Sequence, residues 1–143
     1  MKTKQGFSLL ELLVVMAIIG VVLAIGIVNF SSTNQRSREA KRKADIEVIR
    51  SGLEIYRSEN GAYPTTGQFT VDVNGCINAT TLTNGAATYV SNVPTDPKFN
   101  SSTGQCYIYT RPSTTTYNLS YLMEVSSACT GTVSGSRCVY TQP

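Results

Sequence analysis

The chain contains no histidine, and its four cysteines include no Cys-x-x-Cys pair. Histidine is the usual general base beside a nucleophile, and zinc sites are built mainly from closely spaced cysteines and histidines. These absences argue against a nucleophilic active site and against a zinc site. The sequence therefore predicts a protein that is not an enzyme and that holds no metal or other cofactor.

Net charge is small as well, since 12 Lys and Arg against 9 Asp and Glu give +3. This balance argues against a polyanionic partner, and direct binding of nucleic acid is not expected. A local basic cluster has acidic residues interleaved as intrahelical partners, so we interpret it as a solvated helix face or a subunit contact. The cluster contains Arg36, Arg38, Lys41, Arg42 and Lys43, and the acids are Glu39, Asp45 and Glu47.

Charged residues are nearly absent between Phe7 and Phe30, where almost every residue is apolar. At about 1.5 Å per residue, a helix of this length crosses a bilayer core of roughly 30 Å. The exception is Glu11. A carboxylate costs free energy in a membrane helix, so it is normally there for a partner. The stretch predicts a transmembrane helix in which this acid has a specific role.

The sequence around Glu11, KQGFSLLE over residues 4–11, resembles the processing site of type IV pilins and type II secretion pseudopilins. The resemblance implies that a prepilin peptidase cuts between Gly6 and Phe7 and that the new amine of Phe7 is methylated. It also implies a helical homopolymer in which Glu11 pairs with the Phe7 amine of a neighbouring copy in a low-dielectric bundle. A membrane platform protein and an assembly ATPase are the further partners that the family implies.

An ordinary secretory signal is the competing interpretation of this end of the chain. Its small-residue cleavage site follows the apolar segment, whereas Gly6 precedes it. Within the segment, Gly20 and Gly26 each cost about 1 kcal/mol relative to Ala in a helix. They are candidate assembly residues, either as places where the helix loosens or as small residues that let helices approach closely.

A single long helix is predicted from about Ser8 to about Glu59, ending at Asn60 and Gly61. Its second half carries apolar residues three and four positions apart, which is typical of a helix packed on a sheet. This stripe comprises Ile46, Ile49, Leu53 and Tyr56, and Val48 and Ile55 are expected to widen it.

Strands are expected in the polar second half of the chain. Apolar residues alternate with polar ones over 117–125, and weaker patterns lie at 106–110, 137–141 and 68–73, with 111–116 as a hairpin link. The fold class is therefore α+β: a long N-terminal helix packed on an antiparallel sheet of three or four strands.

We divide the chain into a cleaved leader (1–6), an apolar assembly helix (7–30), an amphipathic helix (31–60) and a β-rich globular part (61–143). Basic residues Lys2 and Lys4 favour a cytoplasmic N-terminus. The precursor is expected in the bacterial inner membrane as a single-pass protein with its C-terminal domain outside the cytoplasm. A cell-surface or periplasm-spanning filament follows from the resemblance.

All cysteines lie in the part predicted to be outside the cytoplasm, where an even number indicates disulfides. Four cysteines allow three connectivities. We favour Cys129 with Cys138 as a local loop and Cys76 with Cys106 as a longer one.

Three functions remain open. The leading hypothesis is a type IV pilus subunit, favoured by the expected disulfides and by the lack of acidic residues after Glu124. Major pseudopilins bind calcium near the C-terminus, and hard cations need carboxylates, so this lack disfavours calcium here. The alternative is a major or minor pseudopilin of a type II secretion or competence system. A monomeric membrane-anchored binding module is a second alternative. Under it Tyr107, Tyr109 and Tyr140 would form a recognition surface, whereas we expect most of these rings to pack on the helix or the sheet.

Overall fold

A computed structural model describes residues 6–72 and 74–142, apart from the side chains of 25–29. Of the predicted leader, residues 1–5 with Lys2 and Lys4 lie outside the described residues. The chain divides into two units, Met1–Gln35 and Arg36–Pro143, and each is described by itself.

One long helix is followed by short strands. The helix confirms its prediction from the sequence to within about a residue at each end, and Gly61, with φ 74°, closes it by donating to the Arg57 carbonyl at 2.8 Å. The elements are α1 (Leu9–Asn60), β1 (Leu82–Asn84), β2 (Ala87–Val90), η1 (Ser101–Thr103), β3 (Ile108–Thr110), β4 (Tyr117–Leu122), η2 (Ser126–Ala128), β5 (Thr132–Ser134) and β6 (Arg137–Gln142).

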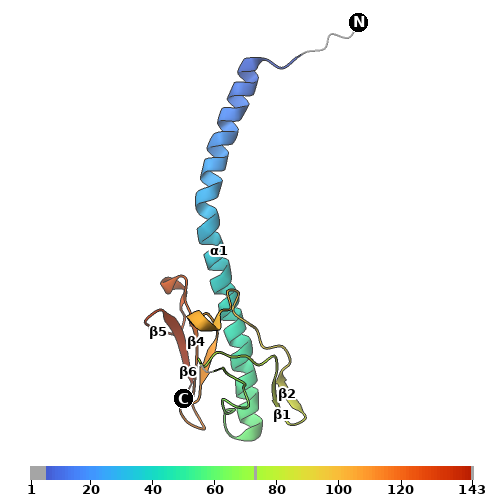
Figure 1. Ribbon diagram of the computed structural model, residues 1–143, viewed down its shortest axis with the longest axis vertical. Helices are drawn as coiled ribbons and strands as arrows, with labels where there is room; N and C mark the ends of the chain where they lie inside the picture. Colours follow the sequence, from blue (N-terminus) through green and yellow to red (C-terminus); the bar gives the residue numbers. More distant parts are fainter. Residues whose placement is uncertain (1–5, 73, 143) are drawn as a thin grey trace. The chain divides into compact units, whose positions relative to one another are not determined.

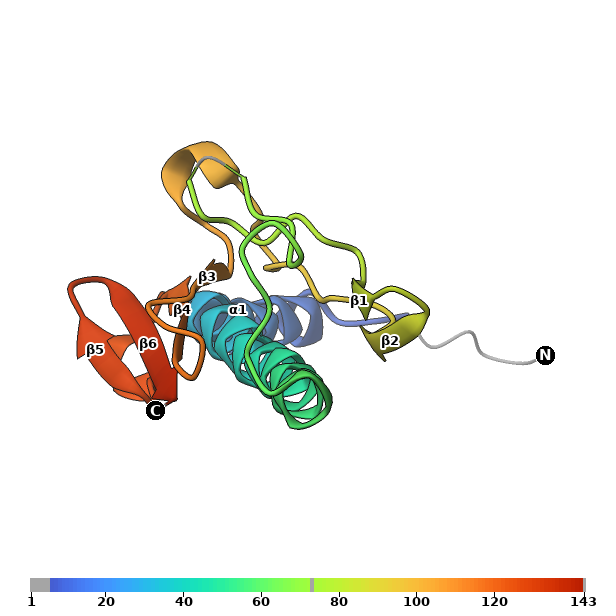
Figure 2. The same ribbon diagram turned by 90° about the horizontal axis from the view of Figure 1, so that it is seen from below.

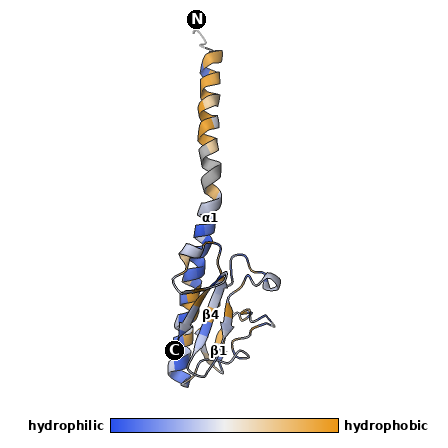
Figure 3. Ribbon diagram, turned by 90° about the vertical axis from the view of Figure 1, so that its left-hand side faces the viewer, coloured by the Kyte–Doolittle hydropathy of each residue, from blue (hydrophilic) through white to orange (hydrophobic). Residues whose placement is uncertain are grey.

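Hydropathy changes along α1, as Figure 3 shows by the hydrophobic colour of its early turns and the hydrophilic colour of later ones. Among the described residues, no helix has a stretch long and apolar enough to cross a membrane. The transmembrane span over 7–30 thus stays a prediction.

The second unit is built on an antiparallel sheet with strand order β3-β4-β6-β5, and β1 and β2 form a separate hairpin. In the sheet, Tyr109 pairs with Leu119 of β4, and Leu119 pairs in turn with Tyr140 of β6. Within this unit, the β1–β2 hairpin and the β5–β6 ribbon lie on opposite sides of α1 (Figures 1 and 2). The predicted α+β class and the β3–β4 hairpin are therefore confirmed.

The core lies between α1 and the sheet. Ile46, Ile49 and Leu53 are fully buried, which confirms the predicted stripe. The prediction that Val48 and Ile55 widen it is wrong, because these residues are 47% and 51% exposed. Each follows a core residue by two positions, about 200° around a helix of 3.6 residues per turn.

Two strand predictions need correction. The expected strand at 68–73 is wrong, because residues 68–70 form a turn and Val71 makes an isolated bridge to Ile77; residue 73 lies outside the described residues. β4 ends at Leu122 rather than at residue 125. The chain leaves the sheet there because the backbone N–H of Glu124 donates to a side-chain oxygen of Glu39 at 2.6 Å.

The β1–β2 hairpin and β5 were not predicted. An Asn-Gly pair, Asn84-Gly85, lies at the turn between β1 and β2, and Asn-Gly between strand-forming residues is a strong hairpin signal. β5 is joined to β6 by two residues, Gly135-Ser136, and a Gly-Ser link of this length is also a hairpin signal, although β5 itself has only three residues, all exposed.

Gly52 is a position at which β2 packs directly on the backbone of α1. A Cβ at this position would lie 2.1 Å from the Val90 Cγ2 and 3.3 Å from the Tyr89 carbonyl oxygen. Gly52→Ala is therefore expected to destabilise the second unit by about 1–3 kcal/mol through overpacking. Urea unfolding measures this loss, and Ser58→Ala, on an exposed position of the same helix, is expected to change stability by less than about 0.5 kcal/mol. Equal stability of the two variants would contradict the packing described.

Disulfides join Cys76 to Cys106 and Cys129 to Cys138, the pairing that the sequence favoured. The first connects the loop before β1 to the start of the β3 segment, and the second ties the chain before β5 to β6. No cysteine of the chain is free.

Candidate functional site

The start of α1 is built by Ser8 and Glu11. The backbone N–H of Ser8 donates to Glu11 Oε2 at 2.9 Å, and the Ser8 hydroxyl oxygen accepts from the N–H of Leu10 at 3.3 Å. Ser-x-x-Glu with these bonds is a capping box, and a carboxylate there also complements the positive end of the helix dipole. The Glu11 carboxylate is thus held at the N–H of Ser8, the residue that follows Phe7, which is the predicted new N-terminus.

Large apolar side chains of the first unit are exposed. Phe7 is 87% exposed and Leu9 86%, and the other large apolar residues that are exposed between them and Leu23 range from 45% to 71%. Single exposed apolar residues are common, but a contiguous set of this kind marks an interaction surface. Gly20 has open space around it, whereas Gly26 lies in α1 within the stretch 25–29, whose side chains are outside the described residues.

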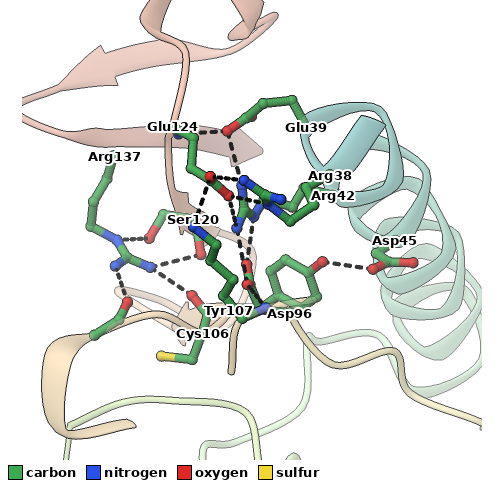
Figure 4. Close-up of polar contacts among 12 residues, drawn as sticks. Arg38, Glu39, Arg42, Asp45, Asp96, Cys106, Tyr107, Ser120, Glu124 and Arg137 are labelled. Carbon is green, nitrogen blue, oxygen red and sulfur yellow. Dashed lines mark hydrogen bonds and ion pairs between the residues drawn. The ribbon is translucent and has the colours of Figure 1, made fainter. Parts of the chain in front are cut away.

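A buried charge network forms a second candidate site, around Arg42 (Figure 4). Arg42 holds Asp96 with two hydrogen bonds, Nε to Oδ2 at 2.7 Å and Nη2 to Oδ1 at 3.1 Å, and it donates to Glu39 at 3.0 Å. It also pairs with Glu124 Oε1 at 2.9 Å. The Arg42 side chain is 1% exposed. Burial alone would lower the pKa of Arg42, but the hydrogen bonds that it donates to Asp96 and Glu124 raise this pKa above its usual value.

Glu124 forms ion pairs with three cations. Arg38 donates to both of its carboxylate oxygens, Arg42 to one, and Lys98 Nζ lies 3.0 Å from Oε2. The hydrogen bond from Arg38 is the largest reason that the pKa of Glu124 lies far below its usual range; burial opposes it, and Lys98 and Arg42 add to it. Three acids, Glu39, Asp96 and Glu124, therefore balance three cations and join α1 to the loop before η1 and to the end of β4.

The depressed pKa of Glu124 predicts acid sensitivity. A carboxyl whose pKa is lower in the folded state contributes stability above its unfolded pKa, and this contribution is lost as pH falls. We expect the melting temperature to fall steadily below about pH 5, and to fall less steeply in Glu124→Gln, which has no such group to titrate. Thermal melts of both proteins from neutral pH downward measure this difference. Parallel curves would contradict a stabilising role for the charged form.

The basic cluster was only partly interpreted correctly from the sequence. Arg36 and Lys41 are exposed, as expected of a solvated face, but Arg42 is buried in the network. Glu39 is an intrahelical partner of Arg42 as expected, and Glu47 pairs with Arg50 at 2.8 Å. The solvated-face prediction is therefore wrong for Arg42 and for the part-buried Arg38, because Asp96 and Glu124, the acids that bind them from outside α1, are distant in sequence.

Arg137 is a second cation of the unit, half-buried, and it contacts carbonyls instead of acids. It donates to the carbonyls of Gly104 at 2.8 Å, Cys106 at 2.9 Å and Ser120 at 3.0 Å (Figure 4). Burial lowers the pKa of Arg137. Arg137 thereby fastens the disulfide-bonded segment at Cys106 to the sheet.

The tyrosines proposed as a recognition surface are buried. Tyr109 is fully buried, Tyr107 and Tyr140 nearly so, and the Tyr107 hydroxyl donates to Asp45 Oδ2 at 2.6 Å. Burial, followed by the bond to Asp45, raises the pKa of Tyr107. These rings belong to the core, which confirms the expectation that they pack on the helix and sheet, and they form no recognition surface for a binding module.

The residues near the C-terminus do not fit a calcium ion. Glu124 is the last acidic residue of the chain, and its carboxylate is already neutralised by Arg38, Arg42 and Lys98. Among the described residues, no three His, Cys, Asp or Glu side chains gather as a metal site. The absence of a cofactor stays a prediction.

Comparison with known families covers both units. Residues 1–27 match the prokaryotic N-terminal methylation motif, and residues 29–128 match the type II secretion system protein G family. The chain belongs to the type II secretion system protein G family. This family consists of structural pseudopilin subunits and not of enzymes, so the pilin-like resemblance and the absence of enzymatic activity are confirmed.

Several relatives are named type II secretion system core protein G. The Escherichia coli (strain K12) relative is 32% identical over 99 residues, covering 66% of each chain. The Dickeya chrysanthemi relative is 34% identical over 67 residues, which cover 47% of this chain and 44% of the relative. The Vibrio cholerae relative is 32% identical over 68 residues, which cover 48% of this chain and 47% of the relative. The chain thus spans just under two thirds of the first relative and less than half of the other two. No solved structure matches it.

Membership of the protein G family favours the secretion pseudopilin over the pilus subunit, which was the leading hypothesis from the sequence. Disulfides had favoured a pilus subunit, but they stabilise any small oxidised domain and do not distinguish one filament from another. The Cys129–Cys138 loop also lies beyond the matched region, which ends at residue 128. The Cys129–Cys138 loop therefore does not distinguish a pilus subunit from a secretion pseudopilin.

Sequence reasoning missed Ser8 and Asp96. The Ser8-x-x-Glu11 spacing is itself a recognisable capping box and could have been identified directly. Asp96 gives no such signal, since it lies 54 residues from Arg42 in a turn-rich loop.

Proposed function

We propose that this protein is a pseudopilin of a type II secretion system, made as a membrane precursor and polymerised through its N-terminal helix into a periplasmic filament. In this proposal, residues 7–30 span the inner membrane before assembly, and the leader 1–6 is removed by a prepilin peptidase. Methylation of the new Phe7 amine follows, as the N-terminal motif over residues 1–27 suggests.

The exposed apolar surface of the first unit is the observation that carries the proposal. Side chains such as Phe7 and Leu9 are almost fully exposed, and apolar area is worth about 25 cal/mol per Å² when removed from water. Burial in lipid before assembly, and against other copies afterwards, accounts for this surface. Neither a soluble monomer nor a simple tether requires the acid at Glu11.

Glu11 has two successive partners in this mechanism. In the single chain its carboxylate caps α1 through the N–H of Ser8. In the filament it also pairs with the charged Phe7 amine of an adjacent copy, which neutralises both groups in a low-dielectric surrounding. Homopolymer contacts, a prepilin peptidase, a membrane platform protein and an assembly ATPase are the partners that this function requires.

Processing and assembly can be tested together in cells that express a prepilin peptidase and the secretion machinery. Mass spectrometry of the mature protein is expected to find an N-terminus at methylated Phe7. A cysteine introduced at Leu12, 57% exposed on α1, is expected to give crosslinked dimers, since one free thiol per chain joins two neighbouring copies. Gly6→Leu serves as the control, since it blocks cleavage and is expected to leave only uncleaved monomers. An uncleaved wild-type chain that remains monomeric would overturn the proposal.

A further inference from the structure

A groove in the second unit lies between α1 and the loops that flank the β1–β2 hairpin. Its volume is about 490 Å³, within the range of about 300–1,000 Å³ that is common for ligand pockets. The lining is partly apolar, since it includes the buried Ile77 and Val93 and the exposed Phe99. Side chains with amide or hydroxyl groups are contributed by Asn78, Thr80, Asn92 and Thr95. A peptide segment, which combines apolar side chains with backbone amides, matches this composition.

Phe99 is the one exposed aromatic residue in the described part of the second unit. Its exposed fraction is 45%, whereas Phe69 and all eight tyrosines of the chain are buried or half-buried. Aromatic residues are enriched at protein interfaces, so an exposed one marks a candidate contact. The groove therefore offers an aromatic surface that the chain itself covers only in part.

Lys41 is the charged residue among those that line the groove, and it is exposed. Within the part of the chain that the structure describes, its side chain takes part in no hydrogen bond and no ion pair. The acids nearest to it along α1 are already bound. Glu39 accepts from Arg42 at 3.0 Å, and Asp45 accepts from the Tyr107 hydroxyl at 2.6 Å. An unpaired cation in a partly apolar groove favours a partner that brings an anionic group.

Neither a second copy of this chain nor a lipid suits Lys41 as well as an acidic protein does. After Gln35 the chain has ten Lys and Arg against eight Asp and Glu, so two copies carry net charge of the same sign there. A lipid headgroup site is typically a cluster of about four to eight basic residues, whereas this groove has one. Each of the eight acids also accepts a hydrogen bond within its own chain: Glu39, Asp45, Glu47, Glu54, Glu59, Asp72, Asp96 and Glu124.

We propose that this groove binds an acidic segment of a different protein, one in which an Asp or Glu lies next to a large apolar side chain. The carboxylate of that segment pairs with Lys41, and its apolar side chain packs on Phe99. Its backbone amides bond to the amide and hydroxyl side chains of the lining. The inference goes beyond the proposed function, because the groove belongs to the second unit and its occupation does not require polymerisation.

A peptide array tests the ligand chemistry on the purified full-length chain in detergent. Its octapeptides carry from none to three Asp residues among Leu, Phe and Ser, and binding is expected to increase with the number of Asp. For the strongest binders, fluorescence anisotropy is expected to show an affinity about threefold lower in Lys41→Gln and about fivefold lower in Phe99→Ala. Lys43→Gln is the matched control, since it removes the same charge from α1 at a residue that does not line the groove.

The array overturns the inference if no peptide binds, if binding ignores the Asp residues, or if Lys41→Gln and Lys43→Gln bind equally well. The second arm places the photo-crosslinker p-benzoylphenylalanine at Asn92, an exposed lining position, in cells that contain the secretion machinery. Mass spectrometry is expected to locate adducts in a segment of another protein that contains Asp or Glu, and Lys41→Gln is expected to reduce them about threefold.

Adducts to a second copy of this chain, to lipid or to a segment without acids would contradict the proposed partner, as would the absence of any adduct. These outcomes leave cleavage at Gly6 and crosslinking through Leu12→Cys untouched. Failure of the groove to bind therefore leaves the proposed function standing, and failure of processing or assembly leaves the groove to be judged by the array.

Discussion

Replacing Glu11 with alanine is expected to leave a chain that is inserted and processed but that assembles at least about tenfold less efficiently. Removing one partner of a buried ion pair typically costs about 3–5 kcal/mol, and each 1.4 kcal/mol is a factor of about ten in an equilibrium constant. The uncompensated group in the variant is the Phe7 amine of the neighbouring copy. Immunoblots of sheared filament and membrane fractions measure assembly, and mass spectrometry of the N-terminus measures processing.

Glu11→Gln separates the two contacts of Glu11. Glutamine keeps a side-chain oxygen that can accept from the N–H of Ser8, as Glu11 does at 2.9 Å, but it carries no charge. If pairing with the amine drives assembly, the glutamine variant is expected to fail nearly as badly as the alanine variant. Assembly of Glu11→Gln at the wild-type level would mean that the cap, and not the charge, is what the filament requires.

Replacing Arg42 with alanine is expected to produce the largest loss of stability in the second unit, about 3–5 kcal/mol. Asp96 and Glu39 are buried, and Arg42 is the cation that binds both. Without it these carboxylates remain in a poorly hydrated site, where an unpaired charge is costly. Urea unfolding of the variant, followed by far-ultraviolet circular dichroism, measures the change.

Arg36→Ala is the matched control, since Arg36 is an exposed arginine of the same helix. It is expected to change stability by no more than about 0.5 kcal/mol. The double variant Arg42→Ala with Asp96→Asn is expected to lose less than the sum of its single changes, because the two residues form one contact. A loss below about 1 kcal/mol in Arg42→Ala, or strict additivity, would contradict the network described.

Local patterns could be predicted from the sequence, and contacts between distant segments could not. Spacings of three and four identified Ile46, Ile49 and Leu53 as the buried stripe, and alternation located β4, because both periods reflect backbone geometry. The same logic failed for Val48 and Ile55, since an apolar residue is not obliged to be buried. The partners of Arg42 depend on where loops fold back, and no local pattern records that.

The two candidate sites differ in the same way. Glu11 was identified because a carboxylate in an apolar stretch conflicts with its surroundings, which makes it visible without a structure. Arg42 sits in a stretch rich in charge, where nothing distinguishes it from Lys41, which stays exposed. A residue whose character differs from that of its sequence neighbours, such as Glu11, can therefore be identified from the sequence. A residue that resembles its neighbours, such as Arg42, cannot be recognised as buried in this way.

The ion pairs around Arg42 also bear on the order of events during folding. Asp96 is 54 residues away from Arg42, so their contact requires closure of a long loop that an early nucleus would not yet have achieved. Contacts that form late contribute little to the rate-limiting transition state. We therefore expect the network to slow the unfolding of the subunit and to leave its folding rate almost unchanged, so that loss of Arg42 would shorten the lifetime of the folded subunit.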